Sequence, residues 1–123
     1  MARAFEAFRI TLDRIEGAKA SLAAAAPSGR SAGLPLAESL AGFDERLSSA
    51  ARSMGPWRTV DVEEAWTSCR SALAEARRRA EDLRLNGAPE SYEQLYGTLG
   101  DLMEPLDQAF SDALERFRAL GAR

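Results

Sequence analysis

Histidine is absent from this chain of 123 residues, and cysteine occurs only once, as Cys69. Without histidine, the chain lacks the commonest general base and a frequent ligand of zinc and haem iron. It also lacks the Glu-x-x-His motif by which helical bundles hold paired metal ions. A single cysteine forms no disulfide within the chain. We therefore expect no catalytic residues, no metal site and no cofactor.

Several features of other protein classes are missing as well. The N-terminal residues, MARAFEAFRITLDR, are charged throughout, so no secretory signal peptide is predicted. The longest uncharged stretch, residues 20–29, is too short and too weakly apolar to span a bilayer. The formal net charge of −3 provides no overall positive field to attract DNA or RNA. We expect a cytoplasmic protein that is not embedded in a membrane.

The composition favours helices. Alanine, leucine, arginine and glutamate dominate, whereas β-branched residues are scarce, and 46% of the residues are hydrophobic. Apolar residues recur at helical spacing in four segments, approximately residues 2–25, 36–54, 62–85 and 92–120. Short breaks that contain glycine or proline separate these segments. This pattern predicts an all-α fold, an antiparallel up-down-up-down four-helix bundle that forms a single domain over residues 1–123.

The second segment has the most regular apolar pattern. Its stripe alternates steps of four and three residues, through Leu36, Leu40, Phe43, Leu47, Ala50 and Met54. When this stripe is superposed on the stripe of the fourth segment, Asp44 falls on Asp107. The match indicates either a duplicated helical hairpin or the coincidence expected of any two heptad-like helices.

Two local signals concern the start and the continuity of helices. Asp61 and Glu64 form a capping-box pattern at the start of the third segment.

Pro105 lies inside the fourth segment, where proline removes a backbone donor and clashes with the preceding turn. We therefore expect the fourth helix to be kinked or broken near Pro105. The main alternative is a fourth segment that is split into two helices.

In such a bundle the aromatic residues gather at one end. This end is expected to hold Phe5, Phe8, Trp57, Trp66, Phe110 and Phe117. Large apolar side chains are usually buried, so we expect the rings chiefly to form a tapering core. The alternative is an open pocket or docking surface at this end. Ile10 falls opposite the apolar stripe of its own helix and is a further candidate, for self-association.

The stretch ARRRAEDLR, residues 76–84, holds four arginines. The candidate contacts for an anion or a nucleic acid are Arg70, Arg77, Arg78 and Arg84. Phosphate binding needs several cations that point the same way with few acids between them. No aromatic residue lies within this stretch to stack on a base.

Acids at helical spacing offer these arginines another role. Glu75 is spaced to pair with Arg79 on the same helix. Across the turn, Asp101 of the fourth segment is expected near Arg77. The pattern therefore favours a charge-matched pair of helices, in which Arg78 points outward and is the arginine most available to a partner.

Taken as a whole, the residues predict a non-catalytic protein that acts through protein–protein contacts or self-association, with a homodimer as one form. Two alternatives remain open. One is an accessory nucleic-acid binder that uses the arginines of the third segment. The other is a protein that binds a small apolar ligand at the aromatic end.

Overall fold

A computed structural model describes residues 2–25, 36–86 and 92–121 of the chain. Within these ranges all secondary structure is helical. The four long helices are α1 (Ala2–Ala25), α2 (Leu36–Arg52), α3 (Glu63–Asn86) and α4 (Tyr92–Ala119). Two short 3₁₀ helices, η1 (Gly55–Trp57) and η2 (Val60–Val62), connect α2 to α3. The all-helical class and the four predicted helical segments are confirmed.

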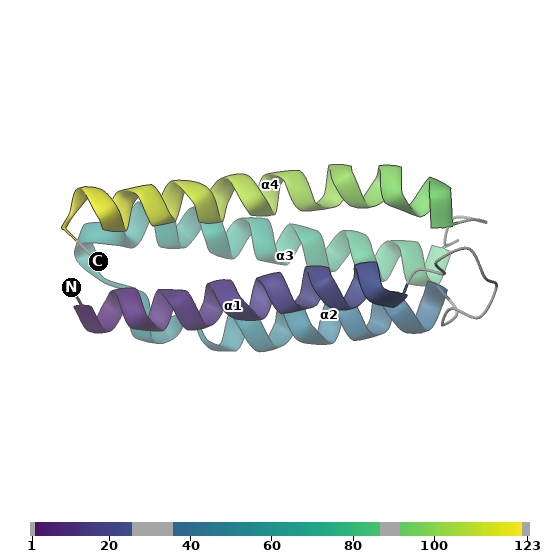
Figure 1. Ribbon diagram of the computed structural model, residues 1–123, viewed down its shortest axis with the longest axis horizontal. Helices are drawn as coiled ribbons and strands as arrows, with labels where there is room; N and C mark the ends of the chain where they lie inside the picture. Colours follow the sequence, from purple (N-terminus) through teal and green to yellow (C-terminus); the bar gives the residue numbers. More distant parts are fainter. Residues whose placement is uncertain (1, 26–35, 87–91, 122–123) are drawn as a thin grey trace.

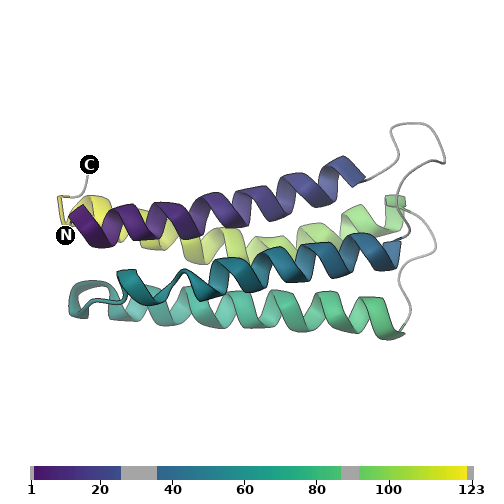
Figure 2. The same ribbon diagram turned by 90° about the horizontal axis from the view of Figure 1, so that it is seen from below.

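The long helices lie side by side along one common direction (Figure 1). The same arrangement is visible from below, after a turn of 90° (Figure 2). Both ends of the chain and the connection from α2 to α3 lie at one end of the molecule. α1 packs closely against α2, α2 against α3, and α3 against α4. Side chains join α1 to α4, because the rings of Phe5 and Phe117 lie 5.5 Å apart between their centroids.

The core follows the apolar stripes. In α2, the side chains of Leu40, Phe43, Leu47 and Ala50 are exposed by 1% or less. The side chain of Leu36 lies outside the described residues. Burial of each large aliphatic or aromatic side chain stabilises the fold by roughly 1.5–3 kcal/mol. The α2 stripe is thus buried as the spacing indicates.

Two ion pairs connect neighbouring helices at Asp44 and Asp107, the two residues that superposition of the second segment on the fourth equates. Asp44 Oδ1 accepts a hydrogen bond from Arg77 Nε of α3 at 3.0 Å. Asp107 Oδ1 accepts one from Lys19 Nζ of α1 at 2.7 Å. Both pairs are partly exposed, so each contributes at most about 1 kcal/mol. They chiefly align the helices along their axes, and both explanations of the match, duplication and coincidence, stay open.

The turn after α2 places a tryptophan in the interior. Pro56 stands at the first or second position of η1, where its missing N–H costs no hydrogen bond. The amide of Trp57 donates to the Met54 carbonyl at 3.2 Å, and that of Arg58 to the Gly55 carbonyl at 3.1 Å. This tight turn points the Trp57 side chain inward, and it is fully buried.

The predicted capping box at Asp61 is wrong. Asp61 lies inside η2, and α3 begins after it, at Glu63. The backbone carbonyl of Asp61 accepts a hydrogen bond from Arg116 Nε of α4 at 3.1 Å. The sequence pattern misplaced the start because a 3₁₀ turn, rather than an extended residue, leads into the helix.

Pro105 lies within α4, which continues through it as one helix of 28 residues. The alternative of two separate helices is therefore wrong. Proline provides no amide hydrogen for the carbonyl of Asp101, one turn earlier. Both residues are on the exposed side of α4, where water can hydrate this carbonyl.

Candidate functional site

The aromatic end, defined by the rings of Phe5, Phe8, Trp57, Phe110 and Phe117, is a continuous cluster of contacts. The centroid of Phe8 lies 5.0 Å from that of Phe117 and 5.1 Å from that of Trp57. Phe8 and Phe110 stack at 6.0 Å. All five side chains are buried. Because ring packs on ring, this arrangement favours a filled core over an open pocket.

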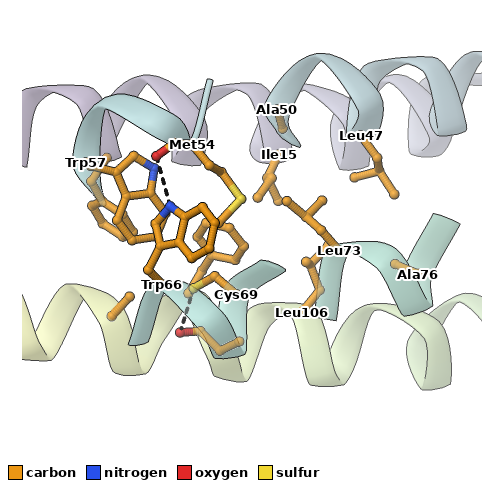
Figure 3. Packing of buried hydrophobic residues seen from close by; sticks show 14 of the residues in the cluster. Ile15, Leu47, Ala50, Met54, Trp57, Trp66, Cys69, Leu73, Ala76 and Leu106 are labelled. Atoms are coloured by element: carbon orange, nitrogen blue, oxygen red, sulfur yellow. Dashed lines mark hydrogen bonds between the residues drawn. The ribbon is translucent and has the colours of Figure 1, made fainter. Parts of the chain in front are cut away.

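Trp66 joins this end through a polar contact. Its indole Nε1 donates to the Met54 carbonyl at 2.9 Å, which fixes α3 against the end of α2 (Figure 3). The guanidinium carbons of Arg58 and Arg70 lie 4.6 Å and 5.4 Å from the centroid of the Trp66 ring. Arg58 also donates to the Glu63 carboxylate at 2.8 Å. The arginines therefore cover the rim of the core with cation–π contacts.

Thr11 and Ser53 are polar residues of this region that sequence reasoning missed. Trp57 Nε1 donates to Thr11 Oγ1 at 3.0 Å, and Thr11 Oγ1 lies 2.6 Å from Ser53 Oγ. Thr11 is fully buried. Its position was a usable signal, because it stands three residues after Phe8 and four before Ile15, in line with the apolar stripe of α1.

A hollow beside the aromatic end lies between η2, α3 and α4 and has a volume of about 560 Å³. It is lined by Val60, Asp61, Glu64, Ala65, Ser68, Ala109, Asp112 and Arg116. Val60 at its edge is 93% exposed. Two of its lining residues are small, Ala65 on α3 and Ala109 on α4. Its carboxylates do not converge, and it shares no residue with the ring cluster.

The arginines of α3 are mostly engaged with acids of the chain. Arg79 Nε donates to Glu75 at 3.0 Å, so the pair predicted from the spacing is confirmed. Arg78 donates to the same carboxylate from Nη2 at 2.7 Å and from Nε at 3.1 Å. These hydrogen bonds lower the pKa of Glu75 to about 2. Arg78 is exposed, as expected, but it is paired with Glu75 on its own helix, and its availability to a partner stays a prediction.

Arg77 pairs with a different helix from the one expected, α2 instead of α4. Its partner is Asp44 of α2, not Asp101 of α4. Arg70, Arg77 and Arg84 are spaced by seven residues and share one flank of α3. That flank borders α2, because Arg77 binds Asp44 of that helix. Arg70 and Arg84 are exposed, the latter in the last turn of α3, where positive charge offsets the helix dipole.

Cys69 lies in the core, where its Sγ donates to the carbonyl of Ala109 at 3.4 Å (Figure 3). Burial raises the pKa of the Cys69 thiol to about 12, and the negative charge of Asp112 adds to the rise. A thiol with such a pKa stays protonated at neutral pH and is a poor nucleophile. This environment provides no activation for covalent chemistry.

The acids of α4 from Asp101 onward are exposed and spread along the helix. Asp101, Glu104, Asp112 and Glu115 make no ion pair within the part of the chain that the structure describes. Across the same ranges, no three histidine, cysteine or acidic side chains come together as ligands for a metal ion. In the described helices, no stretch combines the length and the apolar character needed to cross a membrane.

Ile10 lies on the outer face of α1 and is 51% exposed. One and two turns further along the same helix, Arg14 and Gly17 line a hollow of about 240 Å³ together with Asp13, Arg46 and Ser49. Ile10 is therefore exposed and apart from the buried rings, as its position opposite the apolar stripe predicts. No protein-family model, no curated protein and no solved structure matches this chain.

Proposed function

We propose that this chain is a non-catalytic helical protein that acts in the cytoplasm by binding another protein or a second copy of itself. In this proposal the architecture is an antiparallel up-down-up-down four-helix bundle of one domain, residues 1–123, with α4 kinked near Pro105. The close packing of each helix on the next one along the chain supports the bundle. The missing amide hydrogen of Pro105 supports the kink.

The observation that carries the proposal is the outer face of α1. There Ile10 is 51% exposed in the middle of a regular helix. Next to it, Asp13 and Arg46 line a hollow of about 240 Å³, and neither forms an ion pair among the described residues. An exposed apolar residue bordered by polar side chains resembles the apolar centre and polar rim of a protein–protein contact surface.

Other features of the chain favour a surface role over the two alternatives. The rings at the aromatic end contact one another, which leaves little room for an apolar ligand. Arg77, Arg78 and Arg79 are hydrogen-bonded to carboxylates, so they offer a phosphate backbone less positive charge than their number suggests.

The test is the solution mass of the full chain by light scattering over a range of concentrations, together with capture of binding proteins from the source cells. We expect either a mass above that of the monomer or a specifically captured protein. A strict monomer that captures nothing would contradict the proposal. Binding to DNA at low salt that is lost in Arg77→Glu/Arg78→Glu would favour the nucleic-acid alternative instead.

A further inference from the structure

The outer face of α1 is divided by charge. Ile10 and Gly17 are seven residues apart, so they lie on nearly one line along the helix. Asp13 and Arg14 follow Ile10 by three and four residues, which places them on opposite sides of this line. The line thus separates an acidic flank from a basic flank.

Neighbouring residues extend both flanks. Arg14 Nη1 donates to the Ser49 carbonyl of α2 at 3.0 Å, so α2 borders the basic side, and Arg46 of α2 lines the same hollow. By helical position, Glu6 falls on the acidic side and Arg3 on the basic side. The acidic flank therefore carries Glu6 and Asp13, with Arg9 at its outer edge, and the basic flank carries Arg3, Arg14 and Arg46.

These charges are left unpaired inside the chain. Among the described residues, no member of either flank forms an ion pair, and all six are exposed. The acids and arginines of α3 differ, because Glu75 holds both Arg78 and Arg79. Two complementary flanks without ion-pair partners in the described chain are available to another molecule.

Gly17 adds a second observation. A Cβ atom built at Gly17 meets nothing within 4 Å, so no contact within the described chain requires glycine there. Glycine inside a helix is destabilising relative to alanine. Its lack of a side chain does, however, allow a second helix to approach closely. Ile10, 51% exposed on the same line, provides the apolar contact.

We propose that this face binds a second copy of the chain, with the two α1 helices parallel and related by a two-fold axis that runs along them. The inference rests on the proposed function and specifies its partner. Ile10 then meets Ile10 of the second copy, and Gly17 meets Gly17. A two-fold contact of this kind is self-complementary and closes as a dimer.

Charge decides between the parallel and the antiparallel pair. A two-fold axis along the helices sets the acidic flank of each copy against the basic flank of the other, so Asp13 faces Arg14 and Arg46 of the second copy. If the helices were antiparallel, with the two-fold axis perpendicular to them, the acidic flanks of the two copies would face each other, and so would the basic flanks. Like charges placed opposite each other oppose association, so the parallel pair is favoured.

The first experiment measures the dimer dissociation constant of the full chain by light scattering and sedimentation. Ile10→Asp should raise it roughly a hundredfold, since two apolar contacts are lost per dimer. The matched control is Leu85→Asp on α3, where a leucine 62% exposed is replaced and no change is expected. Equal effects of the two substitutions, or a wild-type chain that is monomeric at all concentrations, would overturn the proposal.

A second pair of variants separates dimer contact from fold stability. Gly17→Ala should raise the melting temperature of the isolated chain, because alanine favours the helix, while it weakens the dimer at least tenfold. Gly100→Ala on α4, where an added Cβ also meets nothing within 4 Å, should raise the melting temperature and leave the dimer unchanged. A Gly17→Ala chain that dimerises as tightly as the wild type contradicts the close approach.

Cysteine cross-linking tests the direction. In a Cys69→Ala background, Ile10→Cys and Gly17→Cys each place one thiol on the line. A parallel pair brings both positions next to their own copies, so each variant should form an intermolecular disulfide. The two positions are about 10 Å apart along the helix, so an antiparallel pair cannot bring both within the roughly 7 Å that a disulfide spans. A disulfide from only one of them overturns the parallel arrangement.

Charge reversal completes the test. Asp13→Arg places an arginine opposite Arg14 and Arg46 of the second copy and should weaken the dimer, and Arg14→Asp should restore it when added to Asp13→Arg. A double variant as weak as the single one overturns the proposal. If none of these substitutions changes the dimer dissociation constant, the proposal is also overturned. The proposed function then still holds, because the copies associate through another face. A monomer that captures no other protein contradicts both.

Discussion

The indole N–H of Trp57 donates a hydrogen bond to the hydroxyl of Thr11 across 3.0 Å, with both side chains fully buried. Ser53 Oγ, 2.6 Å from the Thr11 hydroxyl, donates to the Ala50 carbonyl at 2.6 Å. The Thr11 hydroxyl therefore donates to Ser53, since the Ala7 carbonyl lies further away, at 3.5 Å. This chain of hydrogen bonds joins η1, α1 and the end of α2.

Thr11→Val should destabilise the protein by about 1–3 kcal/mol, because it leaves the buried indole N–H of Trp57 without an acceptor. Urea denaturation followed by tryptophan fluorescence measures the free energy of unfolding. Thr11→Ser is the control, because it keeps the hydroxyl and loses only a methyl group. A Thr11→Val chain that is as stable as Thr11→Ser would show that the hydrogen bond contributes nothing.

Thr59→Val should have the opposite effect. Thr59 Oγ1 is buried and has no hydrogen-bond partner in the described chain, and the extended backbone there, with φ −129° and ψ 161°, suits a β-branched residue. Replacing the unsatisfied hydroxyl by a methyl group of similar shape should raise the free energy of unfolding by about 1 kcal/mol. Thr59→Ser retains the hydroxyl and should not be stabilising. A loss of stability in Thr59→Val on thermal unfolding would contradict the assignment of Thr59 Oγ1 as a buried hydroxyl without a hydrogen-bond partner.

Cys69 should resist thiol reagents in the folded protein at pH 8 and react fully in denaturant, because burial raises the pKa of its thiol to about 12. The reaction is followed by the absorbance of the released chromophore. Rapid labelling without denaturant would show that the thiol is accessible.

The raised pKa of the Cys69 thiol also predicts a loss of stability at alkaline pH. The unfolded thiol, with an ordinary pKa near 9.0, releases its proton before the folded one does. The contribution of the neutral thiol is therefore complete below pH 9 and is lost as the pH rises towards 12. Cys69→Ala should remove this part of the pH dependence, and identical alkaline profiles of the two proteins would refute it.

At acid pH the relevant group is Glu75, whose pKa is lowered to about 2 by hydrogen bonds from Arg78 and Arg79. The unfolded carboxyl takes up a proton near its ordinary pKa of 4.5, whereas the folded one stays charged. Its contribution is thus present above pH 4.5 and lost as the pH falls towards 2. Glu75→Gln should flatten the unfolding curve against pH in this window.

The control for this prediction is Glu81→Gln, an exposed residue of α3 without an ion pair among the described residues. It should leave the acid limb of the pH profile unchanged. If Glu75→Gln and Glu81→Gln have the same profile, the hydrogen bonds to Arg78 and Arg79 do not persist in solution.

The spacing of apolar residues was sufficient to predict the four helices and the buried α2 stripe. Helical periodicity is a local property, so a stripe such as Leu40, Phe43 and Leu47 identifies a buried face without knowledge of what covers it. The pairing of Glu75 with Arg79 was predictable for the same reason, since both residues lie on one helix.

The partners across helices were decided only by the tertiary structure. Arg77 binds Asp44, and not the expected Asp101, because the flank of α3 that carries it borders α2. Thr11 became an acceptor for Trp57 because the tight turn after α2 points the indole back into the core. Such contacts depend on which flanks of separate helices meet and on the reach of their side chains. Neither quantity is contained in the periodicity of a single segment.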